Sequence, residues 1–253
     1  MCAVQGLWVG WAGDTQGEAV TIPEADPQDS SPTAGLRSGQ VRAVQLSAAE
    51  HALYYNGCCN ATLWPLFHSM PDRAVFEETF WSAYTSVNTR FAAETLLALE
   101  QRLREEPDTV PVVWIHDYHL MLAATTIRQL AEERQIPCKI GFFLHIPFPS
   151  WDMVKIFPWH DLVLQGILGC DLVGFHIEDY CINFIDSCRR GLGCRVDRAA
   201  LLVEHGGRTV RVRPLPISIP FQRFQQMAAD APDSNWTDLQ VNCQEKSHVI
   251  HYM

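Results

Sequence analysis

Three short apolar runs without regular polar alternation constrain the fold of this 253-residue chain more than any other feature. They cover residues 110–115, 139–146 and 172–175. A run of this kind is typical of a strand that is covered on both faces, as in a parallel sheet. Helical patterns over 119–134 and 159–168 separate the runs. The order strand, helix, strand, helix, strand predicts a Rossmann-like α/β fold with a doubly wound, mostly parallel sheet.

Further elements are expected on either side of this core. Ser47 and Glu50 have the spacing of a capping box, which predicts a helix from about residue 48 to 56. Apolar residues at helical spacing predict a long helix over 73–105, which ends at Pro107. The remaining expected elements are a strand over 41–46, a helix over 178–191, and a strand or hairpin over 209–219.

Charge and cysteine usage exclude several classes of protein. The formal net charge is −10, which argues against a non-specific nucleic-acid binder because such proteins need a basic face. No uncharged apolar run approaches the roughly 20 residues of a membrane span, and the first residues lack a signal-peptide pattern. The nine cysteines include no CxxC motif and are interpreted as reduced core residues. We therefore expect a cytoplasmic protein with no nucleic-acid or membrane partner.

The pattern also predicts how the chain is organised. Residues 13–40 are rich in Gly, Pro, Ser and Asp and have no periodic apolar face, so a loop is expected there. Residues 226–253 are polar and predict a partly disordered tail. The expected domain therefore covers residues 1–225.

Ligands of a doubly wound sheet bind beyond the carboxyl ends of its strands, and two predicted strands end in polar clusters. The first cluster contains His116, Asp117 and His119; the second contains His145, which Pro147 follows in a stiff segment. Each imidazole could equally serve a structural hydrogen bond, and Asp117 could cap the following helix. A zinc or manganese site built from these residues stays open as an alternative, which would make the chain a metal-dependent hydrolase.

A third cluster combines aromatic and amide side chains over residues 54–68. Aromatic rings with polar tips suit sugar recognition, because sugar C–H groups stack on the rings while hydroxyls form hydrogen bonds. The alternative is an aromatic cluster that packs a helix onto the sheet.

Five motifs occur in an order that resembles the trehalose-6-phosphate synthases, glycosyltransferase family 20, over about residues 7–225. The motifs are Trp8-Val9-Gly10-Trp11, the Tyr-Tyr-Asn to Leu-Trp-Pro run at 54–65, His-Asp-Tyr-His-Leu at 116–120, Gly-Phe-Phe-Leu-His-Ile-Pro-Phe-Pro at 141–149, and Asp-Leu-Val-Gly-Phe-His at 171–176.

The resemblance implies a retaining GT-B glycosyltransferase that transfers glucose from UDP-glucose to glucose 6-phosphate and needs neither a metal nor a cofactor. The N-terminal domain would hold the acceptor, with Tyr55, Trp64 and, less directly, Trp11 around it. Asp117 would bind acceptor hydroxyls, and His145 would contact the donor glucose; these two are the expected catalytic residues. The donor's own leaving phosphate would take the acceptor proton.

The chain also departs from the family pattern. The family's first strand, its Gly-Gly loop and its UDP-binding second domain have no counterpart among residues 1–253. We therefore expect a fragment, truncated at both ends, that is inactive alone. The alternative is a non-catalytic regulatory or sugar-phosphate-sensing module that associates with other trehalose synthase subunits.

Overall fold

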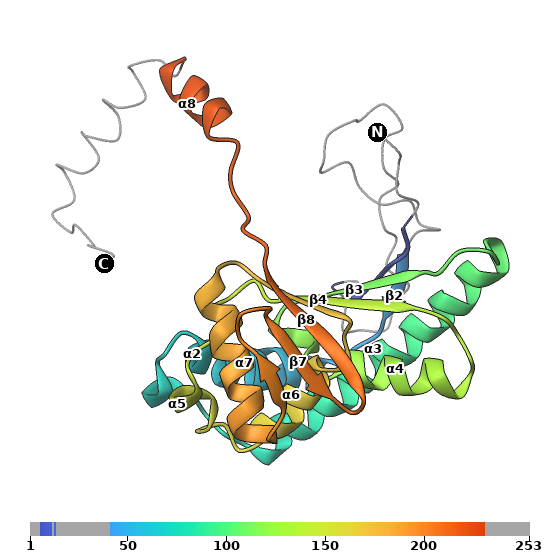
Figure 1. Cartoon of the computed structure of the whole chain (residues 1–253), viewed down its shortest axis with the longest axis horizontal. Helices are drawn as coiled ribbons and strands as arrows, with labels where there is room; N and C mark the ends of the chain where they lie inside the picture. The colour runs from blue at the N-terminus through green and yellow to red at the C-terminus, as the bar shows by residue number, and fades with distance from the viewer. Residues whose placement is uncertain (1–5, 12, 14–40, 231–253) are drawn as a thin grey trace, which may run out of the picture. The chain divides into compact units, whose positions relative to one another are not determined.

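The computed structural model describes residues 6–11, 13 and 41–230, and the chain divides into two compact units, Met1–Pro216 and Ile217–Met253. The strands all belong to the first unit (Figure 1). The second unit contains helix α8 (Phe221–Ala229) within its described part. Apart from residue 13, the predicted loop lies outside the described residues, and so does the predicted tail beyond residue 230.

The first unit is built around a six-stranded sheet with the strand order β3-β4-β5-β8-β7-β6. The first four of these strands are mutually parallel, and β7 and β6 add to them as antiparallel neighbours. Their bounds are β3 Val112–His116, β4 Lys139–Phe143, β5 Leu172–Phe175, β6 Arg195–Asp197, β7 Leu202–His205 and β8 Arg208–Pro214. The prediction of a mostly parallel α/β sheet is confirmed.

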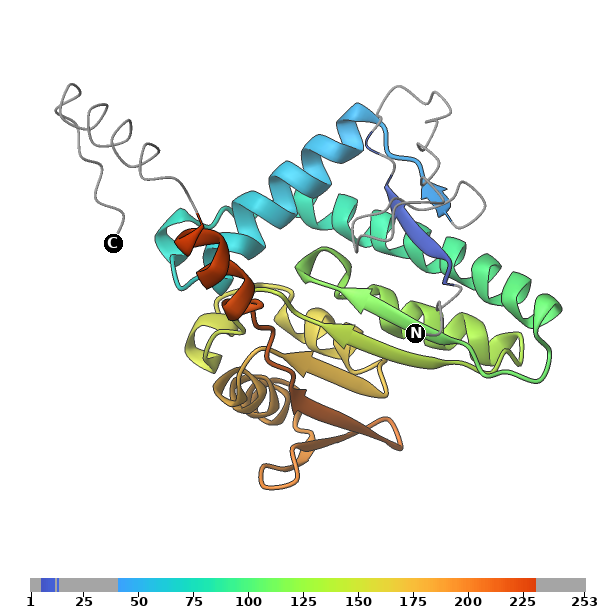
Figure 2. The same cartoon turned by 90° about the horizontal axis from the view of Figure 1, so that it is seen from above.

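A second, two-stranded parallel sheet consists of β1 (Trp8–Trp11) and β2 (Val41–Val44). Figure 2 shows this small sheet beside the β3 edge of the larger one. Within the described residues the two sheets are not joined by a ladder, so β3 pairs with β4 alone and β1 with β2 alone.

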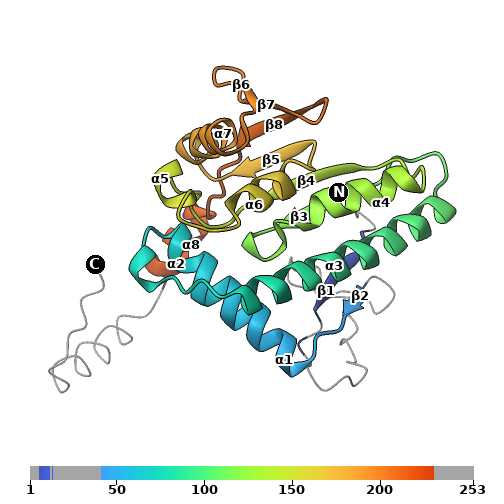
Figure 3. The same cartoon turned by 90° about the horizontal axis from the view of Figure 1, so that it is seen from below.

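Helices pack in a row against the sheet (Figure 3). In order across the row they are α3 (Glu78–Glu105), α4 (Ala123–Glu133), α6 (His160–Ile167) and α7 (Glu178–Leu192), with the short α5 (Trp151–Val154) beside α7. Their buried faces are apolar at helical spacing, as in α4, where Ala123, Ala124, Ile127 and Ala131 are buried. The core lies between this row and the sheet, with Phe142, Phe175 and Phe184 fully buried.

The helix predicted from residue 48 begins as expected but is much longer. The Ser47 hydroxyl accepts the Glu50 N–H, and the Glu50 carboxylate accepts the Ser47 N–H, so the capping box is formed. Helix α1 (Ala48–His51) continues through a π-helix (Ala52–Leu63) into α2 (Trp64–Phe67). Gly57 lets this segment approach α3, because a Cβ there would lie 2.7 Å from the Phe80 ring.

Other boundaries shift for identifiable reasons. The helix predicted over 119–134 begins as a 3₁₀ turn (Tyr118–Leu120), with α4 starting at Ala123, because the chain first turns away from the end of β3. Of the strand or hairpin predicted over 209–219, only the part up to Pro214 is a strand, β8. This strand forms a hairpin with β7, which was not predicted, through Gly206 and Gly207 at φ 55° and 75°. No helix in the described part of the chain is long and apolar enough to cross a membrane.

Candidate functional site

The polar residues that follow three parallel strands gather at one edge of the sheet. Asp117 follows β3, His145 lies just beyond β4, and His176 follows β5. The Asp117 Oδ1 atom accepts the backbone N–H of His145 at 3.1 Å, and an imidazole nitrogen of His176 lies 3.2 Å from the His145 carbonyl oxygen. The predicted proximity of Asp117 and His145 is therefore observed, and backbone contacts fix both residues.

Asp117 has a backbone conformation that non-glycine residues rarely adopt. Its φ is 71° and its ψ is 172°, a region that is accessible to glycine and strained for other residues by about 1–3 kcal/mol. Its N–H donates to the Phe143 carbonyl at 2.8 Å, which continues the β3–β4 ladder through the bend. The surrounding structure thus holds a half-buried carboxylate in a strained position at the sheet edge, as is common at ligand sites.

His145 also contacts a second imidazole. His116 Nδ1 and His145 Nε2 are 3.0 Å apart, so one ring donates a hydrogen bond to the other. Burial, and then the neighbouring His145, lower the pKa of His116. The contact therefore favours a neutral His116 and fixes the direction of the His145 ring.

This contact predicts a titration that can be measured. In an NMR titration of the imidazole C–H signals, His116 is expected to titrate below the ordinary histidine pKa, because burial and a nearby imidazole both disfavour its charged form. In a His145→Ala variant the repulsion is removed, so the His116 pKa should rise. His205→Ala is the control, since β7 is separated from β3 by three strands. An unchanged or lower His116 pKa in His145→Ala would contradict this account.

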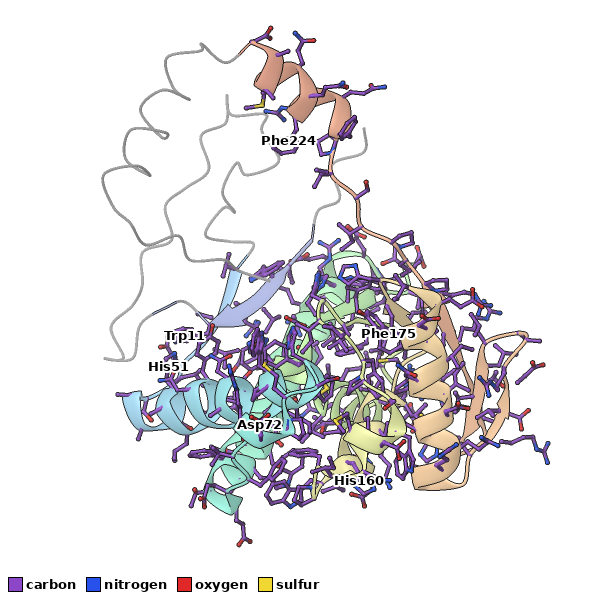
Figure 4. All side chains as sticks on the ribbon, turned by 90° about the vertical axis from the view of Figure 1, so that its left-hand side faces the viewer. Trp11, His51, Asp72, His160, Phe175 and Phe224 are labelled. Carbon is purple, nitrogen blue, oxygen red and sulfur yellow. The ribbon has the colours of Figure 1, made fainter. Side chains whose placement is uncertain are left out.

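Beside this edge lies a small aromatic pocket. The Tyr55 ring is stacked between His51, at 5.1 Å, and His119, at 5.5 Å between ring centroids. Trp11 at the end of β1 lies 4.7 Å from His51, and Figure 4 shows these two side chains. The cavity has a volume of about 240 Å³; its other lining residues are Leu46, Tyr54, Phe91 and Leu120.

His119 connects the pocket to the carboxylate. Its Nδ1 lies 3.8 Å from Asp117 Oδ2, and its buried Nε2 has no hydrogen-bond partner within the described structure. Burial lowers the pKa of His119, while the Asp117 charge acts in the opposite direction. A buried nitrogen without a partner costs free energy, and no described residue compensates for it here.

Two buried side chains form hydrogen bonds to the backbone of the loop that contains His119. The Asn88 amide donates to the His119 carbonyl at 3.0 Å and accepts the Leu122 N–H at 3.1 Å. The Tyr84 hydroxyl donates to the Tyr118 carbonyl at 2.7 Å. Both side chains come from α3. The position of the loop therefore depends on the core as well as on the end of β3.

The structure brings most, but not all, of the predicted site residues together. Trp11 and Tyr55 line one pocket. Asp117 lies 3.8 Å from His119 in the lining of this pocket, and the His145 N–H donates to Asp117. Trp64 is not among the residues that line this pocket. Its exposed ring is stacked on His68 with centroids 4.0 Å apart. A role for Trp64 at the same ligand stays a prediction.

The sequence prediction did not include two residues of the site. His51 precedes Tyr55 by four positions, and the predicted helix from 48 to 56 would have placed both on one face. His176 follows the third apolar run directly, so the rule that pointed to Asp117 and His145 also applies to it. The metal-site alternative gains no support: the described residues contain no group of three or more His, Cys, Asp or Glu side chains that could hold a metal ion.

A mostly parallel sheet with a row of helices, and with polar groups gathered at the carboxyl ends of its strands, is the arrangement of a Rossmann-like domain of a GT-B glycosyltransferase. The family model for glycosyltransferase family 20 matches residues 2–252. The chain belongs to this family.

Its relatives are trehalose-phosphate synthases. The chain is 40% identical over 226 residues to the bifunctional trehalose-6-phosphate synthase/phosphatase of Thermoproteus tenax, covering 88% of this chain and 28% of that protein. It matches the UDP-forming α,α-trehalose-phosphate synthase of Burkholderia xenovorans in complex with glucose-6-phosphate, with TM-score 0.70, 28% identity, and coverage of 88% of this chain and 46% of that one. It also matches an E. coli structure bound with UDP-2-fluoro glucose, with TM-score 0.73, 28% identity, and coverage of 95% and 48%. This chain spans less than half of each of these proteins.

Proposed function

We propose that this chain forms the acceptor-binding half of a UDP-forming trehalose-phosphate synthase. The observation that carries the proposal is the strained Asp117 carboxylate placed beside an aromatic pocket. A carboxylate accepts hydrogen bonds from sugar hydroxyls. The faces of the Tyr55 ring lie against His51 and His119, so Tyr55 would contribute its hydroxyl, while Trp11 would contribute its ring to contacts with sugar C–H groups. Glucose 6-phosphate is the acceptor that fits this role, and it is the ligand in the Burkholderia xenovorans relative.

In the proposed reaction, an acceptor hydroxyl oxygen forms a bond to the donor glucose while the bond from that glucose to UDP breaks. The acceptor proton passes to the leaving phosphate, so no protein base is required. Asp117 orients the acceptor, and His145 contacts the donor glucose. The protein contribution is positioning and charge stabilisation. UDP-glucose is the donor substrate, and the proposal involves no cofactor.

The donor half of the site is proposed to lie in residues that this chain does not contain, because the chain spans less than half of its relatives. The 253-residue chain should therefore bind glucose 6-phosphate without transferring glucose to it. Isothermal titration with glucose 6-phosphate should give saturable binding, and glucose should bind more weakly. A transfer assay with UDP-glucose should give no product. The absence of saturable binding at millimolar glucose 6-phosphate would overturn the acceptor assignment, and product formation would overturn the assignment of the donor half.

Binding without transfer is also what a regulatory or sugar-phosphate-sensing module would show. The observation that favours this second function is that one compact unit contains the whole aromatic pocket together with Asp117. Co-purification with a complete synthase subunit, and a dependence of that association on glucose 6-phosphate, would identify the sensing role. Without such an association, only the first proposal would stand.

A further inference from the structure

Four rings form a column beside the carboxyl edge of the sheet. Trp11 lies against His51, with the ring centroids 4.7 Å apart. His51 is stacked on Tyr55 at 5.1 Å, and Tyr55 is stacked on His119 at 5.5 Å. The rings come from three separate segments: the end of β1, the helix that begins at residue 48, and the turn that follows Asp117. The column therefore connects the small sheet to the turn beside the carboxylate.

His51 lies in the middle of this column and contacts a ring on either side. It precedes Tyr55 by four positions, so the two side chains lie on one face of the helix. Its ring plane makes an angle of 21° with that of Tyr55 and of 36° with that of Trp11. The imidazole forms no hydrogen bond to another described residue, so its contacts in this part of the chain are made by the ring itself.

The backbone that carries His51 is held in place by the capping box and by α3. The His51 N–H donates to the Ser47 carbonyl at 2.9 Å in the first turn of α1. The preceding residue, Glu50, closes the capping box with Ser47 and forms an ion pair with Arg90 of α3. Hydrogen bonds from Arg90 and from the Ser47 backbone lower the pKa of Glu50 to about 2, so the ion pair is intact at neutral pH. His51 is therefore a fixed surface against which a neighbouring ring can pack.

Tyr55 depends on such a surface because it is partly exposed. Its side chain is 37% exposed, and rotation about its side-chain bonds must be restricted by packing. His119 lies against one face of the ring and His51 against the other. The hydroxyl is the part of Tyr55 that a ligand can reach, and its direction follows the orientation of the ring. A ring that is already fixed also binds a ligand more tightly, because no side-chain entropy is lost on binding.

We propose that His51 is a positioning residue of the acceptor site, which fixes the orientation of the Tyr55 ring and links it to Trp11. The inference rests on the proposed function, because it takes Tyr55 and Trp11 as groups that contact the acceptor. His51 acts through the faces of its ring and needs no hydrogen bond to the ligand. Phenylalanine at this position should therefore replace it, and alanine should not.

The protein without ligand gives the first test, because His51 reaches His119 through the Tyr55 ring. In NMR spectra of the imidazole C–H groups, the ring current of Tyr55 shifts the His119 signals. His51→Ala should move these signals, since the Tyr55 ring loses its fixed orientation, and His51→Phe should leave them close to their positions in the parent. Unmoved His119 signals in His51→Ala would show that Tyr55 keeps its orientation without His51, and would overturn the proposal.

Isothermal titration with glucose 6-phosphate gives the second test. His51→Ala should bind roughly tenfold more weakly than the parent, a loss of about 1.4 kcal/mol, because the ligand must then order the Tyr55 and Trp11 side chains. His51→Phe should bind with the affinity of the parent. His160→Ala is the control and should also bind like the parent, since this histidine packs on Trp151 at 5.4 Å and does not line the pocket; Figure 4 labels both histidines.

The two tests separate this inference from the function on which it rests. Equal weakening in His51→Ala and His51→Phe would mean that an imidazole nitrogen binds the ligand, and would overturn the positioning role. Unchanged affinity in His51→Ala would overturn it as well. An absence of saturable binding to the parent would instead overturn the acceptor assignment, and the His119 signals would still decide whether His51 orients Tyr55.

Discussion

Replacing Asp117 with alanine is expected to weaken glucose 6-phosphate binding roughly 100-fold. Hydrogen bonds from sugar hydroxyls to a carboxylate contribute about 1.5–3 kcal/mol each, and about 3 kcal/mol corresponds to this factor. The carboxylate also accepts the His145 N–H, so its loss loosens the strand end that carries His145. Isothermal titration of the parent and variant measures the change.

A glycine variant separates the ligand role of Asp117 from its role in the fold. Asp117 has φ 71° and ψ 172°, where alanine is strained and glycine is not. The free energy of unfolding of Asp117→Gly should therefore be about 1–2 kcal/mol higher than that of Asp117→Ala, after allowing for the entropy cost of glycine. Both variants should bind the sugar phosphate equally weakly. A glycine variant that binds like the parent would contradict the ligand role, and one less stable than the alanine variant would contradict the strain.

The central sheet was predictable because its strands are short and continuously apolar. Phe142 and Val173, in two of the predicted runs, are fully buried, and few other structures bury both faces of a segment this short. The alternation of strands and helices then implied that the strands are parallel, so that their carboxyl ends lie at one edge of the sheet. This rule placed Asp117 and His145 together although they are 28 residues apart in the sequence, and the family resemblance then implied their roles.

The small strands and the winding of the second helix were harder to predict. In β6, Arg195 and Asp197 are exposed, so this strand has no buried pattern to distinguish it from a loop. The π-helix over Ala52–Leu63 contains apolar and polar residues without helical periodicity, and its path depends on packing of Gly57 against Phe80. Strand β6 and the π-helical winding both depend on contacts between segments that are distant in the sequence, so local sequence patterns do not predict them.

Side-chain direction limited the prediction of the site in the same way. Trp64 belongs to the aromatic run that includes Tyr55, yet its ring packs on His68 and does not line the pocket. The positive φ of Asp117 also has no local signal, since aspartate follows many strands without strain. The sequence therefore indicates which residues meet at the sheet edge, and the backbone path determines how each one is presented.

Asn88 is expected to contribute more to stability than any other polar side chain near the site. It is 1% exposed on α3, and its amide bonds to the carbonyls of Tyr84 and His119 and to the Leu122 N–H. Asn88→Ala leaves the Leu122 N–H without a partner in the interior and removes one donor from His119. A buried group left unsatisfied costs about 1–3 kcal/mol, so the free energy of unfolding should fall by about 3 kcal/mol in urea denaturation.

The neighbouring Thr89 provides the control, because its exposed hydroxyl bonds only to the preceding turn of α3. Thr89→Ala should change the free energy of unfolding by no more than about 0.5 kcal/mol. A loss below about 1 kcal/mol in Asn88→Ala would mean that water replaces the amide, and that the loop does not depend on it. With the expected loss, sugar-phosphate binding should weaken as well, since Asn88 holds the carbonyl of the same His119 whose ring lies between Tyr55 and Asp117. Stability and ligand geometry are thus coupled through one buried side chain that never touches the ligand.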